Sequence, residues 1–215
     1  MNLFELLTDV EKRDTSVHRI YGVVVGLVTN NQDPDGLGRV KLKFPWLSDE
    51  DESHWARVAA PMAGNDRGVY FLPEVDDEVL VAFEHGDPRF PYVVGALWNG
   101  KDVPPAKNDD GKNNVRVIKS RSGHVIRLTD EDGKEKIEIV DKSEKNSLVI
   151  DTAKNTITIT SDKDIVFSAS KGAIKLDAKT IEIKSSAETK VESGSGLDVK
   201  ASGTMNIKGA TVNIN

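Results

Sequence analysis

The sequence has no cysteine among its 215 residues. Disulfide bonds, thiolate catalysis and cysteine-bound zinc are therefore excluded. Histidine is scarce as well: His18, His54, His85 and His124 lie in four separate segments without metal-ligand spacing. We expect turn or barrel positions for these four side chains, and neither a metal nor a cofactor.

Aromatic residues make up only 6% of the chain, and they are unevenly placed. All Trp and Tyr residues lie in the first hundred residues, and Phe167 is the only aromatic residue after Trp98. The halves of the chain therefore differ in kind. The first half favours an ordinary globular core, and the second half favours another architecture.

The chain also lacks an excess of positive charge, with a net charge of -6 and a pI near 5.3. This argues against nucleic acid or an anionic membrane as the main partner. No apolar run is long enough to span a bilayer. The opening MNLFELLTDVEKRD has apolar residues at roughly helical spacing and no features of a secretory signal, so we expect assembly in the cytoplasm without a signal peptide.

From Tyr21 to Gly100 the pattern predicts short strands separated by turns. Examples are YGVVVGLVTN, RVKLKFPW and EVLVAFE, and Asp33-Pro-Asp-Gly36 is a typical hairpin turn. Little sequence between these strands favours a helix. A small closed or partly closed barrel is predicted.

Beyond a Pro-, Asn- and Asp-rich linker, apolar pairs separated by one residue recur to the end of the chain. The period is about eight residues. The pairs are Ile137/Ile139, Leu148/Ile150, Ile157/Ile159, Ile165/Phe167, Ile174/Leu176, Ile181/Ile183, Thr189/Val191, Leu197/Val199, Met205/Ile207 and Val212/Ile214.

One such octad supplies one strand and one corner, with two inward side chains. That apolar area is too small to offset the ordering entropy of its residues unless neighbours cover it. Three chains wound together would provide the cover, because each layer of a triangular prism then takes one octad from each chain. Ten octads at one strand spacing each predict a shaft on the order of 50 Å long.

The block from Pro73 to Asn99, PEVDDEVLVAFEHGDPRFPYVVGALWN, resembles the signature of the central spike proteins of contractile injection systems. This family includes phage baseplate assembly protein V and the VgrG spikes of type VI secretion. The segments Gly26–Asn30, Asp35–Leu42 and Ser120–Leu128 fit the same family. The similarity extends over residues 18 to 215, and the usual Gly before Asp-Glu-Val is here Asp76.

The resemblance implies an all-β fold, an OB-fold barrel followed by an intertwined triple-stranded β-helix in a homotrimer. Residues 1–17 would form an N-terminal segment, 18–103 the barrel, 104–119 the linker and 120–215 the spike shaft. The implied role is structural and not enzymatic: a needle tip in a phage tail or phage-tail-like particle that pierces the target envelope. The shaft core and trimer interface would be formed by Ile157, Ile159, Ile165, Phe167, Ile174, Leu176, Ile181, Ile183, Leu197 and Val199.

The implied partners are a baseplate hub protein, inner tube and baseplate components, and transiently the target membrane. The long N-terminal hub region of VgrG is not found here, so we expect a separate hub protein. Its docking site would be Leu3, Phe4, Leu6 and Leu7, although packing of this segment on the barrel stays open. Because no lysozyme-like insert and no final His-x-His are found, we expect neither a cell-wall hydrolase nor tip-bound iron.

A PAAR-type tip protein would cap the blunt end of the shaft. Its platform would be Met205, Ile207, Val212, Ile214 and Asn215.

Several segments resemble catalytic or ligand-binding motifs but lack residues that such motifs require. Gly36-Leu-Gly38 lacks the third glycine of a dinucleotide fingerprint. Asp130-Glu-Asp-Gly133 lacks ligands that a calcium loop needs, and a hairpin turn is predicted instead. The acidic runs 49–52 and 74–78 could pair carboxylates for glycoside hydrolysis, but solvated loops and strand faces explain them more simply.

Two other functions remain open from the sequence. A trimeric β-helical phage depolymerase or adhesin would need aromatic sugar platforms, and the shaft has only Phe167. An OB-fold module for nucleic acid could stack bases on Trp46, Trp55 and Trp98. The acidic charge favours core packing or subunit contacts for these tryptophans.

Overall fold

The computed structural model describes residues 19–47 and 51–214. It divides into two units, Met1–Asp162 and Lys163–Asn215. Apart from the short 3-10 helix η1 (Glu84–Gly86), the regular elements of the described residues are β-strands, which confirms the all-β fold class. No helix in this part of the chain is long and apolar enough to cross a membrane.

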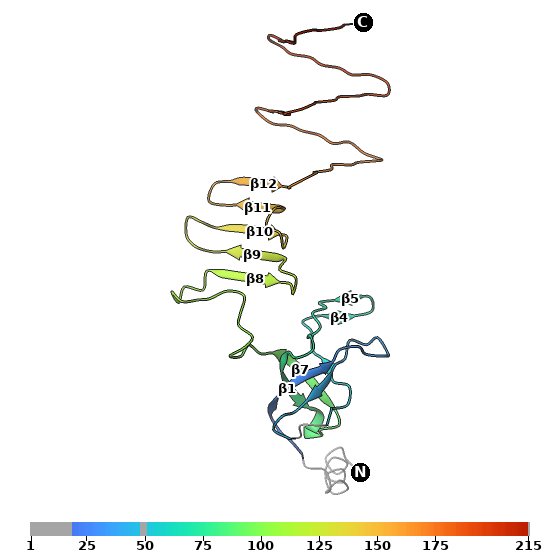
Figure 1. Ribbon diagram of the computed structural model, residues 1–215, viewed down its shortest axis with the longest axis vertical. Helices are drawn as coiled ribbons and strands as arrows, with labels where there is room; N and C mark the ends of the chain where they lie inside the picture. Colours follow the sequence, from blue (N-terminus) through green and yellow to red (C-terminus); the bar gives the residue numbers. More distant parts are fainter. Residues whose placement is uncertain (1–18, 48–50, 215) are drawn as a thin grey trace, which may run out of the picture. The chain divides into compact units, whose positions relative to one another are not determined.

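The first sheet has five strands, and it curls toward a barrel (Figure 1). Neighbouring strands are antiparallel, except for one parallel pair, β3 and β7. Isolated bridges from Val40 to Ala56 and from Lys43 to Glu52 join one edge to the segment before β3, in keeping with an OB fold. The strand order is β2 (Lys41–Lys43), β1 (Val23–Asn30), β6 (Glu78–Phe83), β7 (Pro91–Ala96) and β3 (Arg57–Val58).

The barrel encloses a core of small and medium apolar side chains. Alternation along β6 buries Val79, Val81 and Phe83, because successive side chains point to opposite faces of a strand. Each fully buried Val or Leu contributes about 1.5–3 kcal/mol. The rest of the core is Val28, Val40, Leu42, Phe44, Ala56 and Val93.

None of the three tryptophans belongs to this core. Trp46 and Trp98 are exposed, and Nε1 of Trp46 donates a hydrogen bond to the backbone oxygen of Val25 (3.2 Å). Trp55 is half-buried and lies near the cationic groups of Arg39 and Lys41. Trp46 reaches only the margin of the core, where its ring centroid lies 6.0 Å from that of Phe44.

The turn expected at Asp33–Gly36 connects β1 to β2, and a charged clamp organises it. The carboxylate of Asp33 accepts hydrogen bonds from the backbone of Asp35, Leu37 and Arg39 and from the guanidinium of Arg39 (2.9 and 2.7 Å). The Arg39 side chain, followed by these backbone donors, holds the pKa of Asp33 well below its ordinary value. The clamp fixes the entry into β2.

A second antiparallel sheet follows the barrel, again with five strands. Each strand pairs with the next along the chain, so the sheet is a simple meander (Figure 1). The strands are β8 (Val115–Lys119), β9 (Val125–Thr129), β10 (Lys136–Val140), β11 (Ser147–Asp151) and β12 (Thr156–Thr160).

This sheet changes two expectations from the sequence. Val115–Lys119, assigned above to the end of the linker, form β8, so regular structure begins before residue 120. The pairs Ile137/Ile139, Leu148/Ile150 and Ile157/Ile159 lie in antiparallel strands of one chain, not in octads that wind in one direction. The intervening turns are long enough to reverse the chain, and Glu144 (φ 60°) and Asn155 (φ 53°) occupy left-handed positions in them.

The second unit, residues 163–214, is extended and contains no assigned strand. Its chain runs back and forth between bends (Figure 1). The bends recur about every eight residues, the same period as the apolar pairs, and each pair from Ile165/Phe167 to Met205/Ile207 lies between two bends. They fall at residues 162–163, 170–172, 179, 186–187, 194–195, 202–203 and 210–211.

Asp76, where the resemblance described above implies a glycine, has a left-handed backbone (φ 76°) that costs an L-residue free energy. We predict that Asp76→Gly raises the unfolding free energy of the barrel by about 1 kcal/mol, measured by urea denaturation. Asp77→Gly is the matched control, because Asp77 has no positive φ and its carboxylate accepts a hydrogen bond from Glu74 N (2.8 Å). The control should lose stability; equal changes in both variants would contradict the prediction.

Candidate interaction surfaces

The second sheet has one apolar face, which we call the apolar sheet face. Cross-strand register places Ile126 opposite Ile139, Ile139 opposite Leu148, and Leu148 opposite Ile159. A parallel row on the same face contains Leu128, Ile137, Ile150 and Ile157. Ile118 of β8 extends the first row through its pairing with Ile126.

None of the residues that the structure describes covers the apolar sheet face. Ile157 and Ile159 are 70% and 52% exposed, and all other members except Leu148 are also exposed. A hollow of about 480 Å³ lies over Ile118, Ile126 and Ile139. Contiguous apolar area of this kind indicates an interaction site.

The opposite face of the sheet combines ion pairs with the valines Val115, Val117, Val125, Val140 and Val149. Glu138 of β10 accepts from Lys136 Nζ (3.0 Å) and lies 3.7 Å from the guanidinium of Arg127. The Glu138 side chain is largely buried. The two faces thus differ in composition, and the Ile- and Leu-rich face is the more exposed one.

Side-chain hydrogen bonds tie consecutive turns together along one margin of this sheet. The Asp141 carboxylate accepts from Ser143 Oγ (2.8 Å) and from Asn146 Nδ2 (3.0 Å). The amide oxygen of Asn146 then accepts from Ser161 Oγ (3.1 Å) and Asp162 N (3.1 Å). This network, which we call the turn ladder, links the β10–β11 turn to the end of β12.

The extended unit exposes the apolar pairs expected in the shaft core. Ile165, Phe167, Ile174, Leu176, Ile181, Ile183, Leu197 and Val199 are all exposed in the single chain. The expected tip residues Met205, Ile207, Val212 and Ile214 are exposed as well, whereas Asn215 lies outside the described residues. The expected hub-docking residues Leu3, Phe4, Leu6 and Leu7 also lie outside them.

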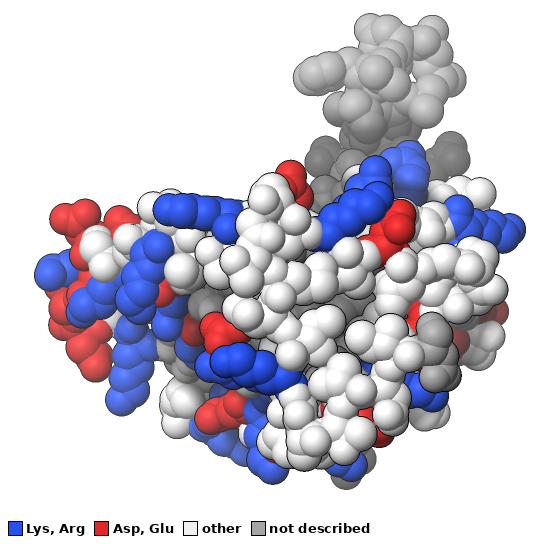
Figure 2. All heavy atoms as spheres, turned by 90° about the horizontal axis from the view of Figure 1, so that it is seen from above, with Lys and Arg blue, Asp and Glu red and all other residues white. Residues whose placement is uncertain are grey.

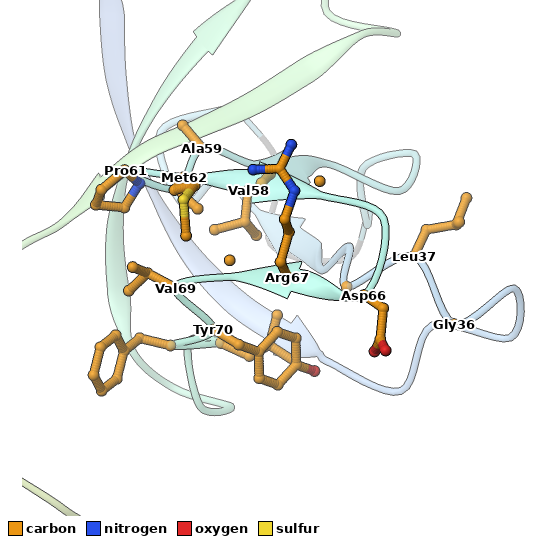
Figure 3. Close-up of a pocket in the computed structure, with 17 residues that line it drawn as sticks. Gly36, Leu37, Val58, Ala59, Pro61, Met62, Asp66, Arg67, Val69 and Tyr70 are labelled. Carbon is orange, nitrogen blue, oxygen red and sulfur yellow. The ribbon is translucent and has the colours of Figure 1, made fainter.

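A short hairpin of β4 (Ala63–Gly64) and β5 (Arg67–Gly68) projects an apolar surface that the sequence did not single out. Met62, Val69 and Tyr70 line a hollow of about 700 Å³ with Leu37 from the β1–β2 turn (Figure 3). Tyr70 and Phe71 are 76% and 69% exposed. The apolar pattern of the sequence around this hairpin predicted strands. Periodicity alone, however, does not show which apolar side chains remain exposed in the fold.

The charged surface has no dominant sign. On the face in Figure 2, Lys and Arg side chains are interspersed with Asp and Glu. Within residues 19–47 and 51–214, no cluster of three or more His, Cys, Asp or Glu side chains could hold a metal ion. The surfaces that stand out are apolar, and they belong to the apolar sheet face, the β4–β5 hairpin and the extended unit.

Comparison with known proteins identifies the barrel. Residues 24–98 match the family described as the type VI secretion system/phage-baseplate injector OB domain. This range contains all the strands of the first sheet apart from the first residue of β1. These residues are similar to an injector OB domain. The motif resemblance found in Pro73–Asn99 is thereby confirmed.

Curated relatives extend the match beyond the barrel. The spike protein VgrG3 of Vibrio cholerae is 32% identical over 111 residues, which is 48% of this chain and 11% of the relative. The spike protein VgrG1a of Pseudomonas aeruginosa is 31% identical over 128 residues, 54% of this chain and 20% of the relative. The actin cross-linking toxin VgrG1 of Vibrio cholerae is 32% identical over 48% of this chain. The chain is VgrG-like, and it spans at most a fifth of these relatives' length.

The turn ladder predicts a specific acid response. Hydrogen bonds from Ser143, and then from Asn146, lower the pKa of Asp141 to about 2 from an ordinary value of 3.8. Because the folded-state pKa is depressed, the stabilisation is present above about pH 4 and is lost as the pH falls from about 4 to about 2. Asp141→Asn should therefore lower the thermal midpoint at pH 7, and the gap to the wild type should close near pH 2.

Thermal denaturation followed by circular dichroism across this pH range measures the gap. Asp110→Asn is the control, since Asp110 contacts only the local backbone of Lys112. A gap for Asp141→Asn that is independent of pH would contradict the role of its charge.

Proposed function

We propose that the chain is a structural, VgrG-like spike subunit of a contractile injection system, active as a homotrimer. One observation carries the proposal: a chain with an injector OB domain continues into residues 163–214, which are extended, apolar at every octad and unpaired as strands. In a trimer, each copy would pair with the extended segments of the other two and cover their apolar residues. Their octads would form a triple-stranded β-helix with the apolar pairs on its axis.

The apolar sheet face supports the same assembly. Each single-layer sheet in the proposed trimer would bury this face against the equivalent faces of two other copies. Removing apolar surface from water contributes about 25 cal/mol for each Å². The first strands of the shaft would thus pair within one chain, and the later octads between chains.

The proposed mechanism is mechanical. The barrel would seat the trimer in a baseplate beside a hub protein and inner tube components, and the shaft would be driven through the target envelope. The last octads, from Met205 to Ile214, would form the platform for a PAAR-type tip protein. The chain would assemble in the cytoplasm and then belong to a phage tail or an injection device.

We propose no enzymatic role for this chain, because three acidic residues of the run 74–78 have local structural roles. Glu74 forms an ion pair with Arg121 (2.9 Å), and Asp77 accepts a hydrogen bond from the Glu74 backbone (2.8 Å). Glu78 accepts from the side chain of Asn99 (3.3 Å). These contacts leave the carboxylates committed to a turn and a strand end.

The trimer is tested by a charge placed on the proposed axis. Ile181→Asp should prevent formation of a stable trimer, because three carboxylates would then be buried together without partners. Ser186→Asp is the matched control, since Ser186 lies in a bend and should face solvent. Analytical ultracentrifugation should give a trimer for the wild type and the control, and a monomer or aggregate for Ile181→Asp.

Negative-stain images of the wild type should show a rod on the order of 50 Å long beside the barrels. A folded monomeric wild type would overturn the proposed function. So would an Ile181→Asp variant that forms a trimer as stable as the wild type.

A further inference from the structure

The outward residues of the second unit carry an ordered pattern of charge. In four consecutive octads, one charged residue lies between the two residues of the apolar pair and a second one follows the pair. At these two positions each octad has one cation and one anion. The first two octads carry Lys175 with Asp177 and Glu182 with Lys184.

The sign order inverts from each octad to the next. After Lys-x-Asp at 175–177 and Glu-x-Lys at 182–184 come Lys-x-Glu at 190–192 and Asp-x-Lys at 198–200. Residues i and i+2 of an extended chain share a face, and three of these pairs form ion pairs at 2.7, 2.5 and 3.5 Å. Contacts within a strand are satisfied by either sign order, so they do not explain the inversion.

Contacts between strands depend on the sign order. Parallel neighbours in a sheet are about 4.8 Å apart, and equivalent positions lie side by side. Opposite charges at such positions stabilise the pair, and like charges destabilise it. Pairing two copies of the same octad would therefore set Lys175 beside Lys175 and Glu182 beside Glu182.

If each octad instead pairs with the following octad of another copy, every charged residue at these positions of the four octads lies beside a residue of opposite charge. Lys175 would lie beside Glu182, and Glu182 beside Lys190. The second position of each octad gives the same result, because Asp177 would lie beside Lys184. The alternation therefore favours neighbours that are offset by one octad.

The offset also fits the path of the chain. Bends at intervals of about eight residues turn the strand onto a new face after every octad, and the chain does not pair with itself along residues 163–214. The strand beside octad n must then come from another copy. In a three-sided shaft, each chain moves to the next face and rises by one strand spacing with every octad. The strand directly above octad n on one face is then octad n+1 of a neighbouring copy.

We propose that the outer charges of residues 175–200 form an intermolecular ladder that fixes the register of the three copies, each octad pairing with the following octad of a neighbouring copy. The partner is a second copy of this chain. This inference rests on the proposed trimer, and it adds the register that the trimer would adopt.

Engineered cysteines test the register directly, because the chain contains none of its own. Adjacent parallel strands bring Cα atoms within the range of about 4.4–6.8 Å that a disulfide requires. Oxidised Lys175→Cys/Glu182→Cys protein should run as a covalent trimer on a non-reducing denaturing gel, since each copy would be joined to both neighbours. The single variants Lys175→Cys and Glu182→Cys should run as monomers.

The outcomes separate the register from the trimer itself. Cross-linked dimers from the single variants, or a double variant that is trimeric in solution but forms no cross-link, would overturn the register. A wild type that is monomeric by ultracentrifugation would overturn the proposed function before any cysteine is introduced.

A charge exchange tests the electrostatic origin of the register. Glu182→Lys/Lys184→Glu keeps the composition and the ion pair within the strand, but it places like charges beside both neighbouring octads. Its trimer should dissociate several degrees below the wild type at low salt, and the difference should largely vanish at about 1 M salt, where the screening length is about 3 Å.

Exchanging both charges in all four octads restores the alternation and should recover the wild-type midpoint at low salt. A Glu182→Lys/Lys184→Glu midpoint equal to that of the wild type, or a deficit unaffected by salt, would overturn the ladder.

Discussion

The backbone of the extended unit sets the constraint on which the rest of the structure depends. Every non-proline residue has one N–H and one C=O that need hydrogen-bond partners once they leave water. Residues 163–214 do not pair with one another as strands, and their apolar pairs are exposed. An extended chain with free edges and an apolar face attracts other strands. Such attraction can lead to aggregation. Assembly with a fixed number of further copies would instead direct it into one specific structure.

The barrel does not share this dependence. Its core from Val28 to Val93 is closed within one chain, and Phe44 packs edge-on against Phe83 with ring centroids 5.6 Å apart. The barrel therefore has what it needs to fold before assembly. The second sheet is intermediate, since its backbone is paired within the chain while its apolar face remains open. The apolar surface and backbone that one chain leaves uncovered thus increase along the chain.

The sequence predicted the barrel and the octad period because both are written in local patterns. The alternation of buried residues in β6 and turn residues such as Asp33 are local patterns. They determine contacts that form within one chain. The direction of the strands between Lys136 and Thr160 was not predictable from apolar spacing, since a hairpin and a one-way winding both use residues i and i+2. The longer, Asp- and Asn-containing turns were the available signal. They include Asp141, Asn146 and Asn155, of which Asn155 has a left-handed backbone.

The candidate surfaces were partly predictable for the same reason. Ile157 to Val199 repeat regularly enough to indicate a shared face, but the exposure of Tyr70 and Phe71 depends on where their hairpin lies in three dimensions. Apolar character shows that a residue can be buried, and only the fold shows what covers it. The hub-docking hypothesis rests on Leu3 to Leu7, which lie outside the described residues.

The way a shaft bears load follows from the direction of its strands. In the proposed trimer each octad runs across the shaft, so its backbone hydrogen bonds point along the axis. Axial compression then presses neighbouring strands together, and it does not pull strands past one another. The shaft could then fail under load only if one chain slipped by one octad relative to the other two. Apolar pairs resist such a slip weakly, because successive octads present similar side chains to the axis. Outer charges that alternate in sign resist it more, because every one-octad slip sets like charges side by side.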